Sequence, residues 1–279
     1  MHVSKRPSVV EHLVLAKLNE GMSVEDWDDL LEKIHLIRSL DGVVSLHVGL
    51  AIPLVGETYT FALHARFVDM AALEAYEAHE YYVEGIMTSN VNDDLLILNW
   101  EGQPQGSLVA SDTYRAAHVG VLKFKECATE ENIEEALSTI KRLQKIFPEL
   151  VTQVSAGRAF VPADLGDSNG FEVAFIVACP TIRACEELDV ESENTDLNKS
   201  SSTGCDSSLL EDIHVVKFRC LTEASAPFTW IDTRRSYWAY TFGAFSNTVN
   251  VLVQGLETHD QNWTDGEPKV RSGVVQFRG

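Results

Sequence analysis

The sequence VEHLVLAKLNEGMSVEDWDDLL, residues 10–31, occurs a second time in altered form as AAHVGVLKFKECATEENIEEAL, residues 116–137. When the two copies are aligned, His12 meets His118, and apolar positions meet apolar positions along most of their length. A sequence that returns at a fixed distance predicts a structural unit that is built twice. This repeat therefore decides the architecture before any local pattern is considered.

Three further stretches continue the repeat in the same order. HVGLAIP (47–53) meets SAGRAFVP (155–162), YTFALHARF (59–67) meets NGFEVAFIVAC (169–179), and DDLLILNW (93–100) meets LEDIHVVKF (210–218). Because the order and the approximate spacing are kept, we expect two units, one at residues 8–105 and one at residues 115–220.

Each copy predicts the order strand, helix, strand, strand, helix, strand. The first strand is an apolar, β-branched run near 9–18 or 116–124. Ser23 and Thr129 follow as natural N-caps, and apolar residues at helical spacing come after each of them. The second helix of the first copy is expected after Asp69. The remaining strands are expected near 43–52, 58–67 and 95–100, and near 151–161, 170–178 and 213–218.

A βαββαβ unit is the ferredoxin-like pattern, and its helices cover one face of its sheet. The other face must be buried against something, and a second unit in the same chain can supply the cover. The predicted fold class is therefore α+β, with tandem ferredoxin-like units whose sheets face each other as a dimeric α+β barrel within one chain.

The composition excludes several function classes. The chain has 42 acidic and 22 basic residues and a formal charge of −20, which disfavours binding to nucleic acid or to an anionic membrane. No secretory signal and no membrane-spanning apolar run is evident. The five cysteines show no zinc or disulfide spacing, so we expect reduced thiols and a cytoplasmic location. No motif indicates a cofactor or a metal site.

One helical stretch raises a question about chemistry. LEAYEAHEYY, residues 73–82, places Tyr76 and His79 three residues apart, a spacing that puts two side chains on one face of a helix. The stretch is either a reaction centre or an amphipathic helix with polar aromatic edges.

These stretches together resemble the stress-responsive A/B barrel domain, also called the dimeric α+β barrel. The resemblance rests on VEHLVLAKL, YTFALHARF, LEAYEAH and DDLLILNW, and it covers residues 8–102 well and 115–220 more loosely. It implies single units that pair as homodimers, or plant-type tandem forms with two units per chain. The family includes boiling-stable stress proteins without established chemistry and olivetolic acid cyclase, which closes a linear polyketide by aldol condensation.

The cyclase implies a specific set of site residues. Its helix carries Tyr-x-x-His-Pro-x-His, in which the tyrosine and the final histidine are catalytic, and a strand histidine approaches the pocket. By this match Tyr76 is the tyrosine, His79 the first histidine and His12 the strand histidine, while Tyr82 replaces the final histidine. Histidine titrates near pH 6.5 and tyrosine near 10, so the replacement removes the base.

Alternatives remain open for each of these residues. Tyr76 and His79 are the catalytic candidates, with His79 as a substitute base, and His12, Tyr76, His79 and Tyr82 are the ligand-binding candidates. Glu80 in place of the proline permits the helix to continue. Structural interpretations are that His12 and His118 pack at the unit interface, that Tyr76 leaves its hydroxyl at a pocket mouth or on water, and that His79 is partly exposed.

Two segments lie outside the repeat. An acidic, serine-rich stretch near 189–208 has the composition of a loop, and we expect it to replace most of the second helix of the second unit. The C-terminal extension, residues 222–279, contains three candidate strands, such as SYWAYTFGAF at 236–245. These predict a small β appendage or a poorly ordered tail.

The sequence therefore predicts a stress-response-associated A/B barrel protein that is non-catalytic and acts in stability, assembly through self-association, or binding of a small apolar or phenolic ligand. One alternative is a polyketide cyclase-like enzyme, an aldol-type lyase that uses the pocket of the first unit. Another is a protein-interaction module that uses the C-terminal strands.

Overall fold

The computed structural model describes seven stretches of the chain. They are residues 8–19, 22–52, 59–87, 91–106, 114–161, 170–194 and 209–220. The predicted C-terminal appendage at 222–279 lies outside the described residues, as does most of the predicted loop near 189–208.

Each half of the chain follows the predicted strand and helix order. The first half contains β1 (Val9–Leu18), α1 (Val24–Arg38), β2 (Val43–Ile52), β3 (Phe61–Phe67), α2 (Met70–Glu77), α3 (Glu80–Tyr82), the π-helix η1 (Val83–Met87) and β4 (Val91–Gly102). The second half contains β6 (Ala116–Phe124), α4 (Glu130–Ile146), β7 (Gln153–Phe160), β8 (Val173–Cys179), α5 (Ile182–Asn194) and β9 (Leu210–Cys220). The two-residue strand β5 (Gln105–Gly106), which was not predicted, lies between the halves.

The first helix of each half begins at its predicted cap. The Ser23 hydroxyl accepts a hydrogen bond from the Asp26 backbone N–H, and the Asp26 carboxylate accepts one from the backbone of Ser23. Thr129 and Asn132 form the same reciprocal pair at the start of α4. Both capping boxes satisfy backbone donors that a helix start would otherwise leave open.

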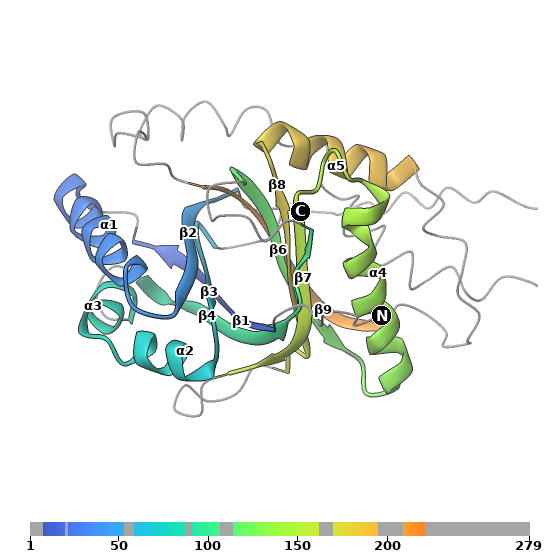
Figure 1. Cartoon of the computed structure of the whole chain (residues 1–279), viewed down its shortest axis with the longest axis horizontal. Helices are drawn as coiled ribbons and strands as arrows, with labels where there is room; N and C mark the ends of the chain where they lie inside the picture. Colours follow the sequence, from blue (N-terminus) through green and yellow to red (C-terminus); the bar gives the residue numbers. More distant parts are fainter. Residues whose placement is uncertain are drawn as a thin grey trace, which may run out of the picture.

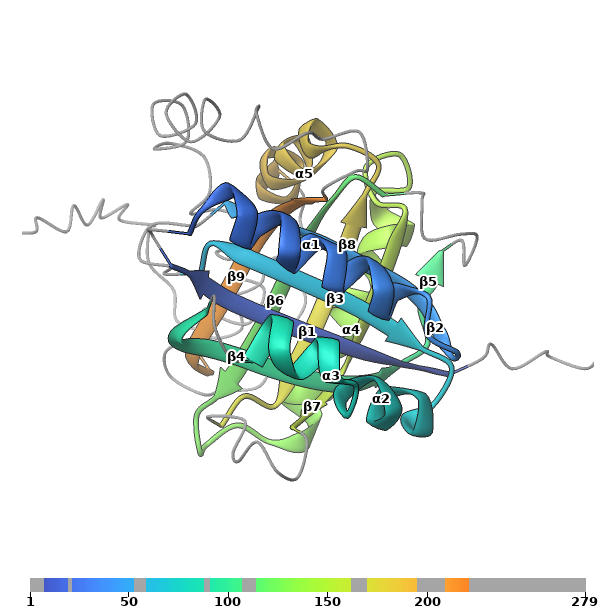
Figure 2. The same cartoon turned by 90° about the vertical axis from the view of Figure 1, so that its left-hand side faces the viewer.

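The strands close into a barrel with the helices outside (Figure 1). The sheet order is β4-β1-β3-β2-β9-β6-β8-β7-β5, and β4 also pairs with β7, so the eight strands from β4 to β7 form a ring. Helices α1 to α3 lie over the strands of the first half (Figure 2), and α4 and α5 lie on the opposite side of the molecule. The predicted α+β class and ferredoxin-like strand order are confirmed.

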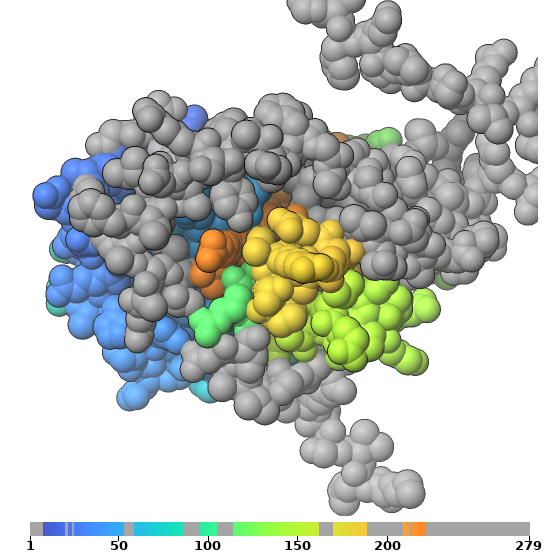
Figure 3. All heavy atoms as spheres, turned by 90° about the horizontal axis from the view of Figure 1, so that it is seen from above, coloured from blue at the N-terminus to red at the C-terminus, as the bar shows by residue number. Residues whose placement is uncertain are grey.

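The two halves meet at two seams with the same register. At the first seam, where β2 pairs with β9, Ala51 lies opposite Phe218. At the second seam, where β4 pairs with β7, Ala159 lies opposite Trp100. These residues are equivalent in the sequence repeat, since Ala51 aligns with Ala159 and Phe218 aligns with Trp100. In the space-filling view, residues of β9 (orange) lie between first-half residues (blue) and α5 (gold) (Figure 3).

A glycine allows close approach at each seam. A Cβ atom added at Gly49 would lie 2.1 Å from the Arg219 carbonyl oxygen, and one added at Gly157 would lie 2.5 Å from the Glu101 carbonyl oxygen. Both distances are shorter than atoms can approach without backbone movement, so only glycine fits. Gly49 and Gly157 also align in the repeat, and so do Arg219 and Glu101.

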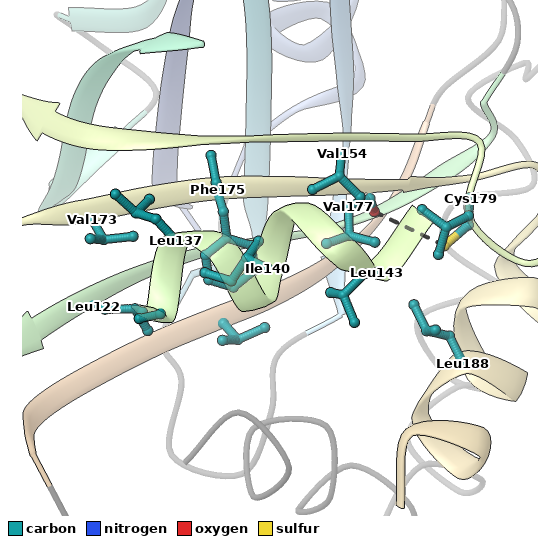
Figure 4. Packing of buried hydrophobic residues seen from close by; sticks show 14 of the residues in the cluster. Leu122, Leu137, Ile140, Leu143, Val154, Val173, Phe175, Val177, Cys179 and Leu188 are labelled. Atoms are coloured by element: carbon teal, nitrogen blue, oxygen red, sulfur yellow. Dashed lines mark hydrogen bonds between the residues drawn. The ribbon is translucent and has the colours of Figure 1, made fainter. Parts of the chain in front are cut away.

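The core has three parts. One lies between the first-half sheet and α1 to α3, and a second lies between the second-half sheet and α4 and α5 (Figure 4). The third combines residues of both halves, such as Leu13, Leu98, Val119 and Phe218, and therefore fills the barrel interior. Along β1, side chains alternate between these surroundings, with Leu13 inside the barrel and Val14 under the helices.

The second helix of the second half corrects a prediction. The acidic stretch was expected to replace most of this helix, but α5 continues through Asn194. Ala184, Cys185 and Leu188 are buried against the second-half core. This apolar stripe at helical spacing anchors the helix, and packing of such a stripe outweighs local composition.

Candidate functional site

The first polar group of the molecule lies between the first-half sheet and the helices that follow β3. His12 on β1 faces the helices and lies opposite Asn99 on β4. Its Nδ1 is 2.7 Å from the Asn99 Oδ1, and its Nε2 is 3.1 Å from the Tyr82 hydroxyl. The Asn99 amide nitrogen donates to the Glu77 carboxylate, which leaves the amide oxygen to accept from His12. Nε2 of His12 must then accept from Tyr82, so both ring nitrogens are satisfied.

Tyr76 packs its ring into the same group, and we call His12, Phe67, Tyr76, Tyr82 and Asn99 the His12 cluster. The Tyr76 ring centroid is 5.7 Å from that of His12 and 4.9 Å from those of Phe67 and Tyr82. His12 and Tyr76 have no exposed surface, and Tyr82 retains 2%. The structure therefore brings three of the four predicted site residues into direct contact, as a closely packed group.

Burial sets the protonation of this cluster. It lowers the pKa of His12 to about 4, although the Asn99 hydrogen bond acts in the opposite direction. Burial, with Tyr82 and Glu77 nearby, raises the pKa of Tyr76 well above 10. At neutral pH the imidazole is therefore uncharged and the phenol keeps its proton.

The Tyr76 hydroxyl does not lie where the sequence predicted. It was expected at a pocket mouth or on water, but it is buried and has no hydrogen-bond partner among the residues that the structure describes. A buried hydroxyl without a partner carries a desolvation cost. The Tyr76 hydroxyl is therefore the polar atom of the His12 cluster whose hydrogen-bonding capacity is unused.

His79 lies apart from the cluster, which corrects two predictions. Helix α2 ends at Glu77, and His79 adopts an extended conformation as the N-cap of α3. Its Nδ1 accepts a hydrogen bond of 3.3 Å from the Tyr81 backbone N–H. Helix α2 therefore does not continue into Glu80, where the separate helix α3 begins, and His79 does not share a face with Tyr76. The physical reason is that a side-chain acceptor at an N-cap competes with helix continuation.

A second polar group lies inside the barrel, and the sequence analysis missed it. Glu11 on β1 is fully buried, and its Oε1 accepts from the Arg66 guanidinium at 2.8 Å. Its Oε2 accepts from His64 Nε2 at 2.8 Å, and His64 Nδ1 is 2.9 Å from the Tyr114 hydroxyl. The His47 ring lies 4.0 Å from the Tyr114 ring. We call these five residues the barrel network.

The charges of the barrel network are balanced. Burial alone would raise the pKa of Glu11, but Arg66 and His64 outweigh it and lower that pKa to about 2. Burial, together with His64 and nearby arginines, lowers the pKa of His47 to about 3. A carboxylate is thus paired with a guanidinium, and His47 is neutral at physiological pH. His64 and Arg66 are two residues apart in a strand that is buried on both faces, so both side chains lie on the same face of the sheet. This pair of ionisable residues in an otherwise apolar strand was the sequence signal from which the network could have been predicted.

The second half lacks both arrangements. Ala117, Ile176 and Ala178 occupy the positions of Glu11, His64 and Arg66 in the β6–β8 register. His118, the partner of His12 in the repeat, is buried and lies opposite Lys217 instead of an asparagine. The two sheets of the barrel therefore differ in chemistry although their strands match.

Other kinds of site are absent from the stretches that the structure describes. Within them, no group of three or more His, Cys, Asp or Glu side chains could hold a metal ion. No described helix is long and apolar enough to cross a membrane. Cys127, Cys179 and Cys220 are free thiols.

The fold and the strand histidine define a class of protein, the α+β barrel built from ferredoxin-like strand order. Comparison of the sequence with known families agrees. Residues 10–97 match the family described as "Stress responsive A/B Barrel Domain". This part of the chain is therefore similar to the stress-responsive A/B barrel domain.

Individual proteins are similar in sequence or in fold. The chain is 26% identical over 188 residues to a stress-response A/B barrel domain-containing protein of Arabidopsis thaliana, covering 66% of this chain and 70% of that protein. The crystal structure of a "Putative monooxygenase" of Fusobacterium nucleatum has a TM-score of 0.51 at 11% identity, covering 78% of this chain and 94% of that chain. This likeness concerns the fold alone. A dimeric protein of ferredoxin-like fold from Bacteroides fragilis is 24% identical with a TM-score of 0.28, covering 33% of this chain and 95% of that one.

Proposed function

We propose that the chain is a tandem A/B barrel protein in which units at 8–105 and 115–220 form an intramolecular pseudo-dimer. The two seams support this proposal, because equivalent residues of the repeat pair in the same register at both. Gly49 and Gly157 permit the same close contact, one at each seam. A single unit of this kind exposes one sheet face, and here each unit covers the face of the other.

The proposed activity is non-catalytic and associated with the stress response, through stability, assembly or binding of a small apolar ligand. One observation carries this proposal: the Tyr82 hydroxyl occupies His12 Nε2 at the position where the resemblance requires a catalytic histidine. A tyrosine cannot serve as a base at neutral pH, and the neutral His12 ring has no nitrogen left to abstract a proton. A cytoplasmic location and self-association of whole barrels remain predictions.

The test is a direct search for turnover. The purified chain is incubated with linear polyketides, and the products are separated and identified by mass spectrometry. The proposal expects no cyclised product beyond the buffer control. Cyclisation that depends on enzyme concentration and disappears in Tyr76→Phe would contradict it, and Tyr81→Phe, which changes a nearby tyrosine outside the His12 cluster, is the matched control.

A second candidate is ligand binding at the His12 cluster, and the unpartnered Tyr76 hydroxyl favours it. A ligand with one polar atom would supply the missing partner and contact the surrounding rings. At about a hundred times its dissociation constant, such a ligand stabilises the fold by ~2.7 kcal/mol. Thermal unfolding with plant-type phenolics and polyketides should show this shift in the parent chain and not in Tyr76→Phe. If turnover were also seen, the aldol-type lyase alternative would replace the binding proposal.

A further inference from the structure

The barrel network offers a site separate from the His12 cluster, on the opposite face of the same sheet. Its members come from three adjacent strands and from Tyr114, just before β6. In the β1–β3 register Glu11 lies opposite Arg66, and in the β2–β3 register His47 lies opposite His64. The network therefore occupies one end of the barrel interior, and apolar side chains such as Leu15 and Leu96 fill the next layers.

The fold does not require these polar residues. The second half holds the same strand pairing with Ala117, Ile176 and Ala178 at the equivalent positions. Replacing a buried ion pair by apolar residues of suitable volume is often neutral or stabilising, so stability alone gives weak grounds for keeping one. The difference between the two halves indicates that the network has a task of its own.

Hydrogen-bond directions show which atoms of the network remain open. The Glu11 carboxylate can only accept, so His64 Nε2 donates to it, while His64 Nδ1 is hydrogen-bonded to the Tyr114 hydroxyl. In either direction this bond uses only part of the hydrogen-bonding capacity of the Tyr114 hydroxyl, whose oxygen can still accept a second hydrogen bond. Nε2 of His47 is buried and has no hydrogen-bond partner in the described part of the chain.

The residues at this end of the barrel are buried but keep slightly more exposed surface than those in its middle. His47, Tyr114 and Arg66 keep 8%, 6% and 5% of their surface exposed, whereas Leu13 and Leu98 in the interior keep none. Trp100 borders the network: its ring stacks on His64 with 6.2 Å between the ring centroids, and its indole N–H donates to Ser155. The Tyr114 ring belongs to the network itself. The open polar atoms are thus surrounded by flat apolar surfaces.

We propose that this end of the barrel binds a small neutral molecule with a hydroxyl group on an aromatic body. The hydroxyl donates to the Tyr114 oxygen or satisfies His47 Nε2, and the aromatic body packs on the neighbouring rings. Ions are disfavoured, because Arg66 and Glu11 already pair with each other and burying a further unpaired charge is costly. This site is additional to the proposed function, which concerns the other face of the sheet.

The test uses the full chain with ¹⁵N-labelled histidines and phenol as the probe, with benzoate and benzylamine as its charged counterparts. Phenol should shift the side-chain nitrogen resonances of His47 and His64, and the two ions should not. Tyr114→Phe removes one acceptor and should weaken the phenol dissociation constant about tenfold. Tyr81→Phe, which lies outside both polar groups, is the matched control.

Three results would overturn the proposal. They are resonances of His47 and His64 that do not respond to phenol, an equal response to an ion, or a phenol response lost in Tyr76→Phe and kept in Tyr114→Phe. The last result would place phenol at the His12 cluster. If Tyr114→Phe does not fold, the apolar triple variant (Glu11→Ala, His64→Ile, Arg66→Ala), which copies the second half, serves instead. It keeps Tyr114 and His47 but removes the His64 hydrogen bond that holds the Tyr114 hydroxyl, so its His47 response to phenol should weaken and not disappear.

Discussion

Acid should destabilise this protein at a pH where its surface carboxylates are still ionised. His12 and His47 are held neutral in the folded chain, with pKa values of about 4 and about 3, against 6.5 when solvated. His12 faces Tyr76, Tyr82 and Glu77, and His47 faces Tyr114, His64 and the arginines nearby. Below pH 6.5 the unfolded chain therefore binds protons at these histidines that the folded chain does not bind. The free energy of unfolding consequently decreases as the pH is lowered.

The size of the effect follows from the same shifts. Between pH 7 and pH 5, protonation of the unfolded state costs about 2 kcal/mol of folding stability for each histidine. The two together remove about 4 kcal/mol, a large part of the 5–15 kcal/mol typical of a domain. The Glu11 contribution is lost later, as pH falls from 4.5 towards its folded pKa of about 2.

Urea unfolding followed by tryptophan fluorescence at pH 7, 6 and 5 measures this dependence. His12→Gln and His47→Gln should each reduce the loss between pH 7 and pH 5 by about 2 kcal/mol, whatever their effect at pH 7. His35→Gln, on the exposed face of α1, is the control. A pH dependence that neither cluster variant changes would refute the argument that burial holds these histidines neutral.

Other substitutions test the seams and the network. Gly49→Ala and Gly157→Ala should each destabilise the chain by at least about 1–3 kcal/mol in urea unfolding, because backbone must move. Gly85→Ala, whose added Cβ meets only the flexible Lys33 side chain at close range, should be tolerated, and equal losses in all three would contradict the seam argument. Glu11→Ala alone should cost about 3–5 kcal/mol, since it leaves Arg66 buried and unpaired. The apolar triple variant should cost much less at pH 7, and a larger loss would show that the network is needed for folding.

Much of the fold could be predicted because it depends on local patterns that repeat. The strands at 9–18, 43–52 and 116–124 have the bounds found in the structure, since alternation and β-branched runs mark them clearly. Ser23 and Thr129 were recognisable as caps from residue type and position. The strand pairings at the two seams were not predicted, because pairing between distant edge strands leaves no local pattern in the sequence.

The site was harder to predict because it depends on contacts between distant residues. The resemblance grouped His12, Tyr76 and Tyr82, which lie in contact in the structure, but spacing alone put His79 on the wrong face, since the two-residue break between α2 and α3 is not visible in periodicity. Glu11 was read as one residue of an apolar strand. Its partners, 53 and 55 residues away, became apparent only from the register of β1 and β3.

The central claim is that one chain closes the barrel on itself through two equivalent seams. Amide-to-amide nuclear Overhauser contacts across β2–β9 and β4–β7 test it, measured on labelled protein diluted tenfold into unlabelled chain. The account predicts that contacts such as Ile52 with Lys217 and Asn99 with Phe160 persist at full intensity, because both strands belong to the labelled molecule. Contacts that disappear on dilution would show that the seams join different chains, and their absence in both samples would show that the barrel is not closed.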